Sequence, residues 1–113
     1  MAYDANIVNS DKPVGDAMKP SEALQAHRAT IRSIVERHHA YNARVFGSVL
    51  RGCDTEESDL DILIEPTPDT TMMDIGAIRY ELHQLLGVPI DVLTPKALPA
   101  SFRAQVVAEA QPI

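Results

Sequence analysis

The sequence predicts an α+β fold in which a small sheet of about three to four strands is flanked by helices. Apolar residues recur at helical spacing in three segments, which are 21–41, 69–86 and 97–110. Short apolar runs bounded by turn residues predict three strands, which are 44–46, 60–64 and 88–93. The resulting order of helix, strand, strand, helix, strand and helix is typical of a small sheet covered by helices.

The first part of the chain is predicted to hold a leader and one helix. Residues 1–20 show no hydrophobic periodicity and are expected to form a flexible leader before a single domain over residues 21–113. Ser21 is expected to cap the first helix. That helix should end near Tyr41 and Asn42, because asparagine tolerates the left-handed conformation found at helix ends.

The central part is predicted to contain two strands joined by a polar connection. Residues 44–46 form a short strand that leads into Gly47 and Ser48. Residues 49–58 follow as a turn or short helix and then an acidic loop. The next strand, 60–64, has aspartates at its entrance and is otherwise apolar.

The remaining chain is predicted to form a helix, a strand and a last helix. The helix over 69–86 should pack one face on the sheet and end at Gly87. Its expected core-facing residues are Met73, Ile75, Ile78, Leu82, Leu85 and Leu86. A strand over 88–93 ends before Pro95, and the helix over 97–110 is expected to cover the sheet.

Composition excludes several classes of protein. The formal net charge of −6 argues against a protein that grips long nucleic acid, which usually shows a basic face. No apolar run approaches the ~18 residues of a membrane-spanning helix, so no membrane role is expected. A single cysteine, Cys53, rules out an internal disulfide and predicts a cytoplasmic protein.

Acidic residues within apolar strands point to a metal site. Asp59 and Asp61 alternate with Leu60 and should point the same way from one strand. Like charges this close repel, and a divalent cation such as Mg²⁺ removes the conflict. Asp91 is a third acid within an apolar strand and can join them if the two strands are neighbours. A solvent-exposed Asp-x-Asp and an edge-strand aspartate facing water are the alternatives.

A glycine and a serine directly after a strand point to phosphate binding. Gly47 lets backbone approach a ligand closely, and Ser48 adds a hydroxyl donor. Arg51, three residues further on, is placed to contact a phosphate. Each signal is weak alone, and an ordinary turn with a solvated arginine is the alternative.

The spacing Gly-Ser-x(10)-Asp-x-Asp joins these signals. With "FGSVLRG", "SDLDILI" and the acid in "IDVL", the sequence resembles the minimal nucleotidyltransferases of the polymerase-β-like superfamily over about residues 44–95. The resemblance implies that superfamily's core, a small mixed sheet flanked by helices. It also implies transfer of a nucleoside monophosphate from a nucleoside triphosphate, here ATP, to a hydroxyl group.

The resemblance also implies roles for individual residues. Asp59, Asp61 and Asp91 would be the catalytic residues and would ligate two Mg²⁺ ions, with Asp91 helping to deprotonate the acceptor. Gly47 and Ser48 would hold the β- and γ-phosphates. Attack on the α-phosphorus independently requires an aligned nucleophile and a neutralised pyrophosphate.

The resemblance further implies a partner. Larger relatives carry additional domains that bind base or acceptor, and 113 residues leave no room for them. A chain of this size resembles the antitoxin of a toxin–antitoxin pair, whose partner is a HEPN-domain RNase toxin with an acceptor tyrosine. The alternatives are an antitoxin that neutralises by occlusion without catalysis, and transfer to a small molecule such as an antibiotic, for which the sequence indicates no cavity.

Overall fold

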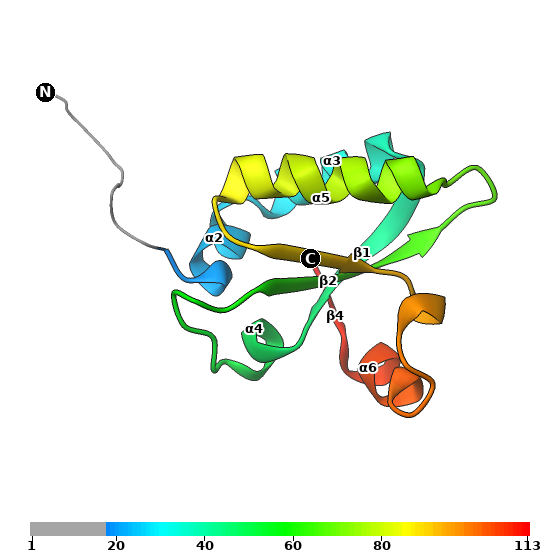
Figure 1. The fold of residues 1–113 in the computed structure, drawn as a ribbon. Helices are drawn as coiled ribbons and strands as arrows, with labels where there is room; N and C mark the ends of the chain where they lie inside the picture. The colour runs from blue at the N-terminus through cyan, green and yellow to red at the C-terminus, as the bar shows by residue number, and fades with distance from the viewer. Residues whose placement is uncertain (1–17) are drawn as a thin grey trace, which may run out of the picture.

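The computed structural model describes residues 18–113, which fold as a four-stranded mixed sheet flanked by helices (Figure 1). In the order β3–β2–β1–β4, the central strand β1 pairs antiparallel with both neighbours, and β2 pairs parallel with β3. The strands are β1 (Ala40–Phe46), β2 (Leu60–Pro66), β3 (Ile90–Leu93) and β4 (Gln111–Pro112). The predicted fold class is confirmed, and the predicted leader lies outside the described residues except for its last part, Met18 to Pro20.

Helices lie on both sides of this sheet. Figure 1 shows α3 and α5 along one face, with α4 and α6 on the other side. The helices are α2 (Pro20–Ala26), α3 (Arg28–Arg37), α4 (Ser48–Arg51), α5 (Met72–Leu86) and α6 (Arg103–Glu109), with a 3₁₀ turn, η1 (Pro95–Ala97), after β3. In the described part of the chain, no helix combines the length and the apolarity needed to cross a membrane.

The alternation of side chains along β2 separates two cores. Leu60, Ile62 and Ile64 belong to the main core beneath α3 and α5. Leu63 points the other way and packs in a smaller cluster with Leu98 and Ala110. Asp61 is on the same side of β2 as Leu63, because the two residues are two positions apart. The acid therefore lies on the sheet face opposite α3 and α5.

The prediction of one long first helix is wrong. The chain breaks at His27 (φ −134°) into two helices, α2 starts at Pro20 rather than after a Ser21 cap, and α3 ends at Arg37. Strand β1 begins at Ala40, four residues before the predicted start, because its first residues pair with the end of β2. Asn42 does adopt a positive φ of 54°, but at an irregularity within β1 and not at a helix end.

Helix α5 is shorter than predicted at its start. The Thr71 hydroxyl accepts the Asp74 N–H at 3.1 Å, and the Asp74 carboxylate accepts the Thr71 N–H at 2.8 Å. This reciprocal cap begins the helix at Met72 instead of residue 69. Met73, predicted to face the core, is 85% exposed. The predicted end at Gly87, which has φ 71°, is confirmed.

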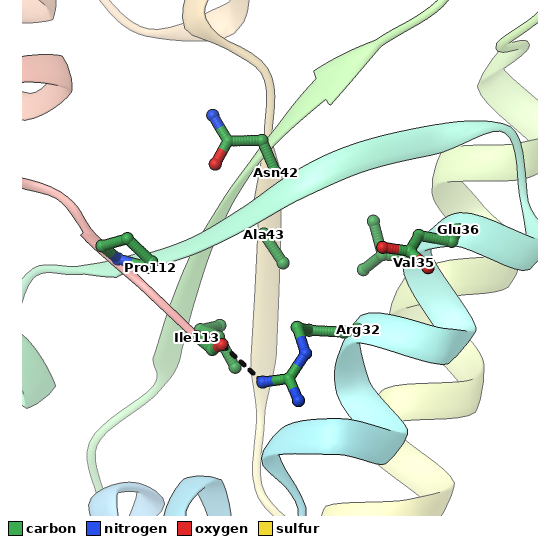
Figure 2. A pocket seen from close by; sticks show the side chains of 7 residues that line it. All are labelled: Arg32, Val35, Glu36, Asn42, Ala43, Pro112 and Ile113. Carbon is green, nitrogen blue, oxygen red and sulfur yellow. Dashed lines mark hydrogen bonds between the residues drawn. The ribbon is translucent and has the colours of Figure 1, made fainter.

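The C-terminal segment differs from the single helix predicted over 97–110. Helix α6 covers only part of that range, and the chain then adds β4 to the free edge of β1. The Arg32 guanidinium fixes this strand by donating to the Ile113 carbonyl at 2.7 Å (Figure 2). A pocket of about 130 Å³ lies beside this contact, between α3 and the sheet. It is lined by Arg32, Val35, Glu36, Asn42, Ala43, Pro112 and Ile113.

Candidate active site

Two of the predicted acids lie side by side on neighbouring strands. Asp61 of β2 pairs with Asp91 of β3 in the parallel register, and Phe46 of β1 pairs with Asp61 on its other side. Residues paired across a sheet project from the same face, so these three side chains form a row across three strands. The sequence predicted this neighbourhood for Asp61 and Asp91 only if their strands were adjacent, and the register makes them direct partners.

Asp59 lies at the edge of this row. It directly precedes β2 and is exposed, so it is not held by the strand as Asp61 is. Its carboxylate is nevertheless close enough to raise the pKa of Asp61 through its charge. The structure thus places Asp61 and Asp91 opposite each other on paired strands and Asp59 at the entrance of β2.

Gly47 contacts the central acid of the row. It follows Phe46 directly and has φ 77° and ψ −149°, a combination that is essentially restricted to glycine. A Cβ atom at this position would lie 2.2 Å from the Asp61 Oδ2. The backbone of Gly47 therefore contacts the Asp61 carboxylate, and any side chain at position 47 would overlap it.

Ser48 and Arg51 occupy opposite ends of the short helix α4. Ser48 is its first residue, and N–H groups in a first helical turn have no intrahelical acceptor, so they are free to bind an anion. Arg51 is the last residue, followed by Gly52 in the left-handed conformation, and its side chain is exposed. Within residues 18–113 Arg51 forms no ion pair with the acids, so the structure does not bring it into the row.

Burial and the neighbouring carboxylates change the titration of Asp61. Burial, followed by the charges of Asp91 and Asp59 and a hydrogen bond with Asp91, raises the pKa of Asp61 from 3.8 to about 6. The folded state holds this proton more tightly than the unfolded state. Its stabilising contribution is therefore full below pH 3.8 and is lost as the pH rises through about 6.

Titration of the metal-free protein tests this arrangement. In ¹³C NMR of the carboxyl groups, Asp61 is expected to titrate with a midpoint near pH 6. The substitution Asp91→Asn should lower that midpoint, because it removes the nearest like charge. Asp69→Asn removes an exposed acid from the loop that precedes α5 and should leave the midpoint unchanged. An ordinary pKa for Asp61 in the unsubstituted protein would contradict the side-by-side arrangement.

The carboxylates of Asp61 and Asp91 supply some of the ligands that a divalent cation needs. Adjacent carboxylates supply the hard oxygen ligands that Mg²⁺ prefers, and their mutual repulsion is what a cation relieves. Among residues 18–113, no three histidine, cysteine or acidic side chains form a ready-made cage for a metal ion. Asp61 and Asp91 therefore fit an ion that takes its remaining ligands from water and phosphate, as Mg²⁺ usually does.

Sequence reasoning missed two buried polar residues. Asp54, in the predicted acidic loop, is only 9% exposed and accepts the Ser21 N–H at 2.9 Å. Arg44 is also buried and forms an ion pair with Glu65. Nothing in the local pattern indicated the Asp54 contact, since its partner lies 33 positions away in the chain.

A second pocket, of about 250 Å³, lies at the far ends of β2 and β3. It is lined by Glu65, Pro66, Thr94, Pro95 and Lys96. Neither this pocket nor the one beside α3 includes a predicted site residue. The acids therefore do not line either of these two pockets.

Comparisons with known proteins agree with the motif. Residues 28–113 match the nucleotidyltransferase domain family. A provisionally named protein adenylyltransferase of Methanocaldococcus jannaschii, MJ0435, is 34% identical over 77 residues, which are 68% of this chain and 83% of that protein. A solved structure provisionally described as a minimal nucleotidyltransferase has a TM-score of 0.75 at 40% identity, covering 82% of this chain and 95% of that one.

A second solved structure shares the fold at lower identity. It is described as a toxin–antitoxin with AMP-PNP, and it has a TM-score of 0.61 at 15% identity, covering 81% of this chain and 70% of that one. The fold, the motif and the family match over most of the chain lead to one assignment. This chain belongs to the nucleotidyltransferase domain family and is a transferase of the EC 2.7.7 type.

Proposed function

We propose that this protein transfers AMP from ATP to a hydroxyl group of a partner protein, and that the partner is a HEPN-domain RNase toxin modified on a tyrosine. The protein then acts as the antitoxin of the pair, in the cytoplasm. Two comparisons support this proposal: a relative carries the name of a protein adenylyltransferase, and a structure described as a toxin–antitoxin with AMP-PNP shares the fold.

The observation that carries the proposal is the contact between Gly47 and Asp61. It joins the two halves of the motif, because the turn that begins α4 lies directly against the central acid of the row. A triphosphate held at the start of α4 by Ser48 and the first-turn N–H groups would present its α-phosphorus to the carboxylates. Arg51 has the reach of a long side chain and is proposed as a further phosphate contact.

The chemistry needs little beyond positioning and a proton acceptor. The acceptor oxygen attacks the α-phosphorus, a new P–O bond forms, the α–β bridging bond breaks, and pyrophosphate leaves. Asp91 is exposed at the row and is proposed to take the acceptor's proton. Asp59, Asp61 and Asp91 would hold Mg²⁺, which neutralises phosphate charge when bound. Asp61 must be ionised for this role, and a bound cation favours the ionised form by lowering the pKa of its carboxylate ligands.

The exposed positions of Asp59 and Asp91 favour a macromolecular acceptor. Neither of the two pockets described above is lined by one of the acids. A partner protein that covers the face would supply both the acceptor hydroxyl and the exclusion of water.

One observation favours the alternative, an antitoxin that neutralises by occlusion. In the described part of the chain, the three acids do not form a complete metal cage. A chain that only covers its partner's active site would not need one. The two functions differ in what happens to the mass of the partner.

Intact mass spectrometry of the partner tests the proposal. The protein is co-expressed and purified with its proposed HEPN-domain partner, and the complex is incubated with ATP and Mg²⁺. We expect the partner to gain the mass of one or more adenylyl groups, and substitution of its acceptor tyrosine by phenylalanine should prevent the gain. Neutralisation of the toxin with no change in mass would support occlusion and contradict transfer.

A further inference from the structure

The loop between the two halves of the motif is tied to a distant helix by one buried carboxylate. Asp54 lies between Ser48 and Asp59 and is 9% exposed. Its Oδ2 accepts the backbone N–H of Ser21 in the first turn of α2, at 2.9 Å. The Ser21 N–H also holds the pKa of Asp54 below its usual range, so the group is a carboxylate at neutral pH.

The hydrogen bond between Asp54 and Ser21 ties this loop to an element outside the loop and α4. The other hydrogen bonds of residues 52–59 stay within the loop and α4, for example from the Cys53 N–H to the Ser48 carbonyl at 3.1 Å and from the Thr55 N–H to the Ser58 hydroxyl at 2.9 Å. Among the described residues, the Asp54 contact is the one hydrogen bond from this loop to another element.

Helix α2 is a firm point of attachment. Pro20, Ala23 and Leu24 are buried, and the helix packs against both α3 and α5. Figure 1 shows α2 at the end of the sheet where the chain leaves α4 and returns to β2. A carboxylate fixed to α2 therefore restrains the middle of the loop. One end of the loop follows α4, which begins at Ser48, and the other end carries Asp59.

We propose that Asp54 is a positioning residue of the transferase, which holds α4 and Asp59 in register by anchoring their loop to α2. This inference rests on the proposed function and extends it to a residue outside the motif. Asp54 bonds to Ser21 of α2, so it acts through Ser48 and Asp59. Without the anchor, the loop would have to be ordered by nucleotide binding, at the expense of nucleotide affinity.

Four substitutions test the proposal by steady-state kinetics with the partner protein at a saturating concentration. Three of them change residues of the loop. Asp54→Ala removes the acceptor and should lower kcat/KM for ATP by about 10- to 100-fold, mainly through a higher KM. Asp54→Asn keeps a carbonyl acceptor for the Ser21 N–H and should stay within about 3-fold of the unsubstituted protein. Glu56→Ala removes one charge from the same loop at an exposed position and should have little effect.

Glu22→Ala separates positioning from stability. Glu22 accepts the Lys19 N–H at 2.9 Å and so supports the start of α2 without touching the loop. Both Asp54→Ala and Glu22→Ala should lower Tm, but only Asp54→Ala should raise KM. An equal effect of the two on KM at equal loss of Tm, or no effect of Asp54→Ala, would overturn the proposal.

Hydrogen exchange gives a readout that does not depend on catalysis. Asp54→Ala should speed exchange of the amides of residues 48–59, and Glu22→Ala should not. Unchanged exchange in Asp54→Ala would overturn the anchor. If the unsubstituted protein modifies no partner at all, the proposed function fails, and the exchange measurement still decides whether the anchor exists.

Discussion

The substitution Asp61→Asn is expected to abolish nucleotide transfer while leaving the protein more stable in the absence of metal. Asp61 is the central acid, paired with Asp91 and in contact with Gly47. Asparagine keeps the size of the side chain but removes the charge that would hold a cation. The rate of adenylyl transfer should therefore fall by about 10³-fold.

The gain in stability follows from the sign of the pKa shift. The pKa of Asp61 is raised to about 6, so its ionised form destabilises the folded state above that pH. A neutral asparagine removes the cost of burying this charge and its repulsion by Asp91 and Asp59, so the free energy of unfolding in urea at pH 8 with EDTA should rise. Below pH 3.8 the two proteins should be more alike, because Asp61 is then protonated in both the folded and the unfolded states.

Measured together, the two effects separate catalysis from folding. Transfer is followed with ATP labelled at the α-phosphate, and stability by urea unfolding of the same preparation. Asp69→Asn, an acid in the loop before α5, should change neither. Transfer at the unsubstituted rate by Asp61→Asn would exclude Asp61 from the reaction.

The placement of Asp61 was predictable because its signal is local. Because side chains alternate along a strand, Asp61 must lie on the opposite face of β2 from Leu60 and Ile62, whatever the neighbouring strands are. The pairing of Asp61 with Asp91 was not fixed in this way, since register depends on how β3 returns after α5. The parallel β2–α5–β3 connection brings Asp91 beside Asp61, and periodicity alone could not choose that residue over its neighbours.

The errors arose where tertiary contacts override local pattern. Residues up to Tyr41 fit a helix, yet pairing with Glu65 draws Tyr41 into β1. Met73 fits the apolar face of α5, yet it lies in the first turn and is exposed. Asp54 looks like part of a solvated acidic run, and only the position of α2 makes it a buried anchor.

The substitution Gly47→Ala is expected to impair both folding and transfer. Alanine must adopt φ 77° and ψ −149°, a region that disfavours any side chain, and its Cβ would lie 2.2 Å from the Asp61 Oδ2. Strain and overlap together should lower the free energy of unfolding by about 3 kcal/mol. Transfer should fall by at least about 10²-fold, because Asp61 has to leave the row to make room.

Gly52→Ala is the matched control for this prediction. Gly52 has a similar φ of 74°, in the left-handed helical region, but a Cβ there would meet no atom within 4 Å. Its alanine variant should lose about 1 kcal/mol from backbone strain and should keep most of its transfer activity. Equal loss of activity in the two variants would show that the α4 turn, and not the contact with Asp61, is what matters.

A double substitution isolates the contact between Gly47 and Asp61. Asp61→Ala removes the Oδ2 that overlaps the added Cβ, so it should restore part of the stability lost in Gly47→Ala. In a double-mutant cycle measured by urea unfolding, the two stability changes should therefore not add. Additive changes would mean that the glycine is required only for its backbone conformation. The turn at Gly47 and Ser48 would then be linked to the acids through the sheet and not through the direct contact of Gly47 with Asp61.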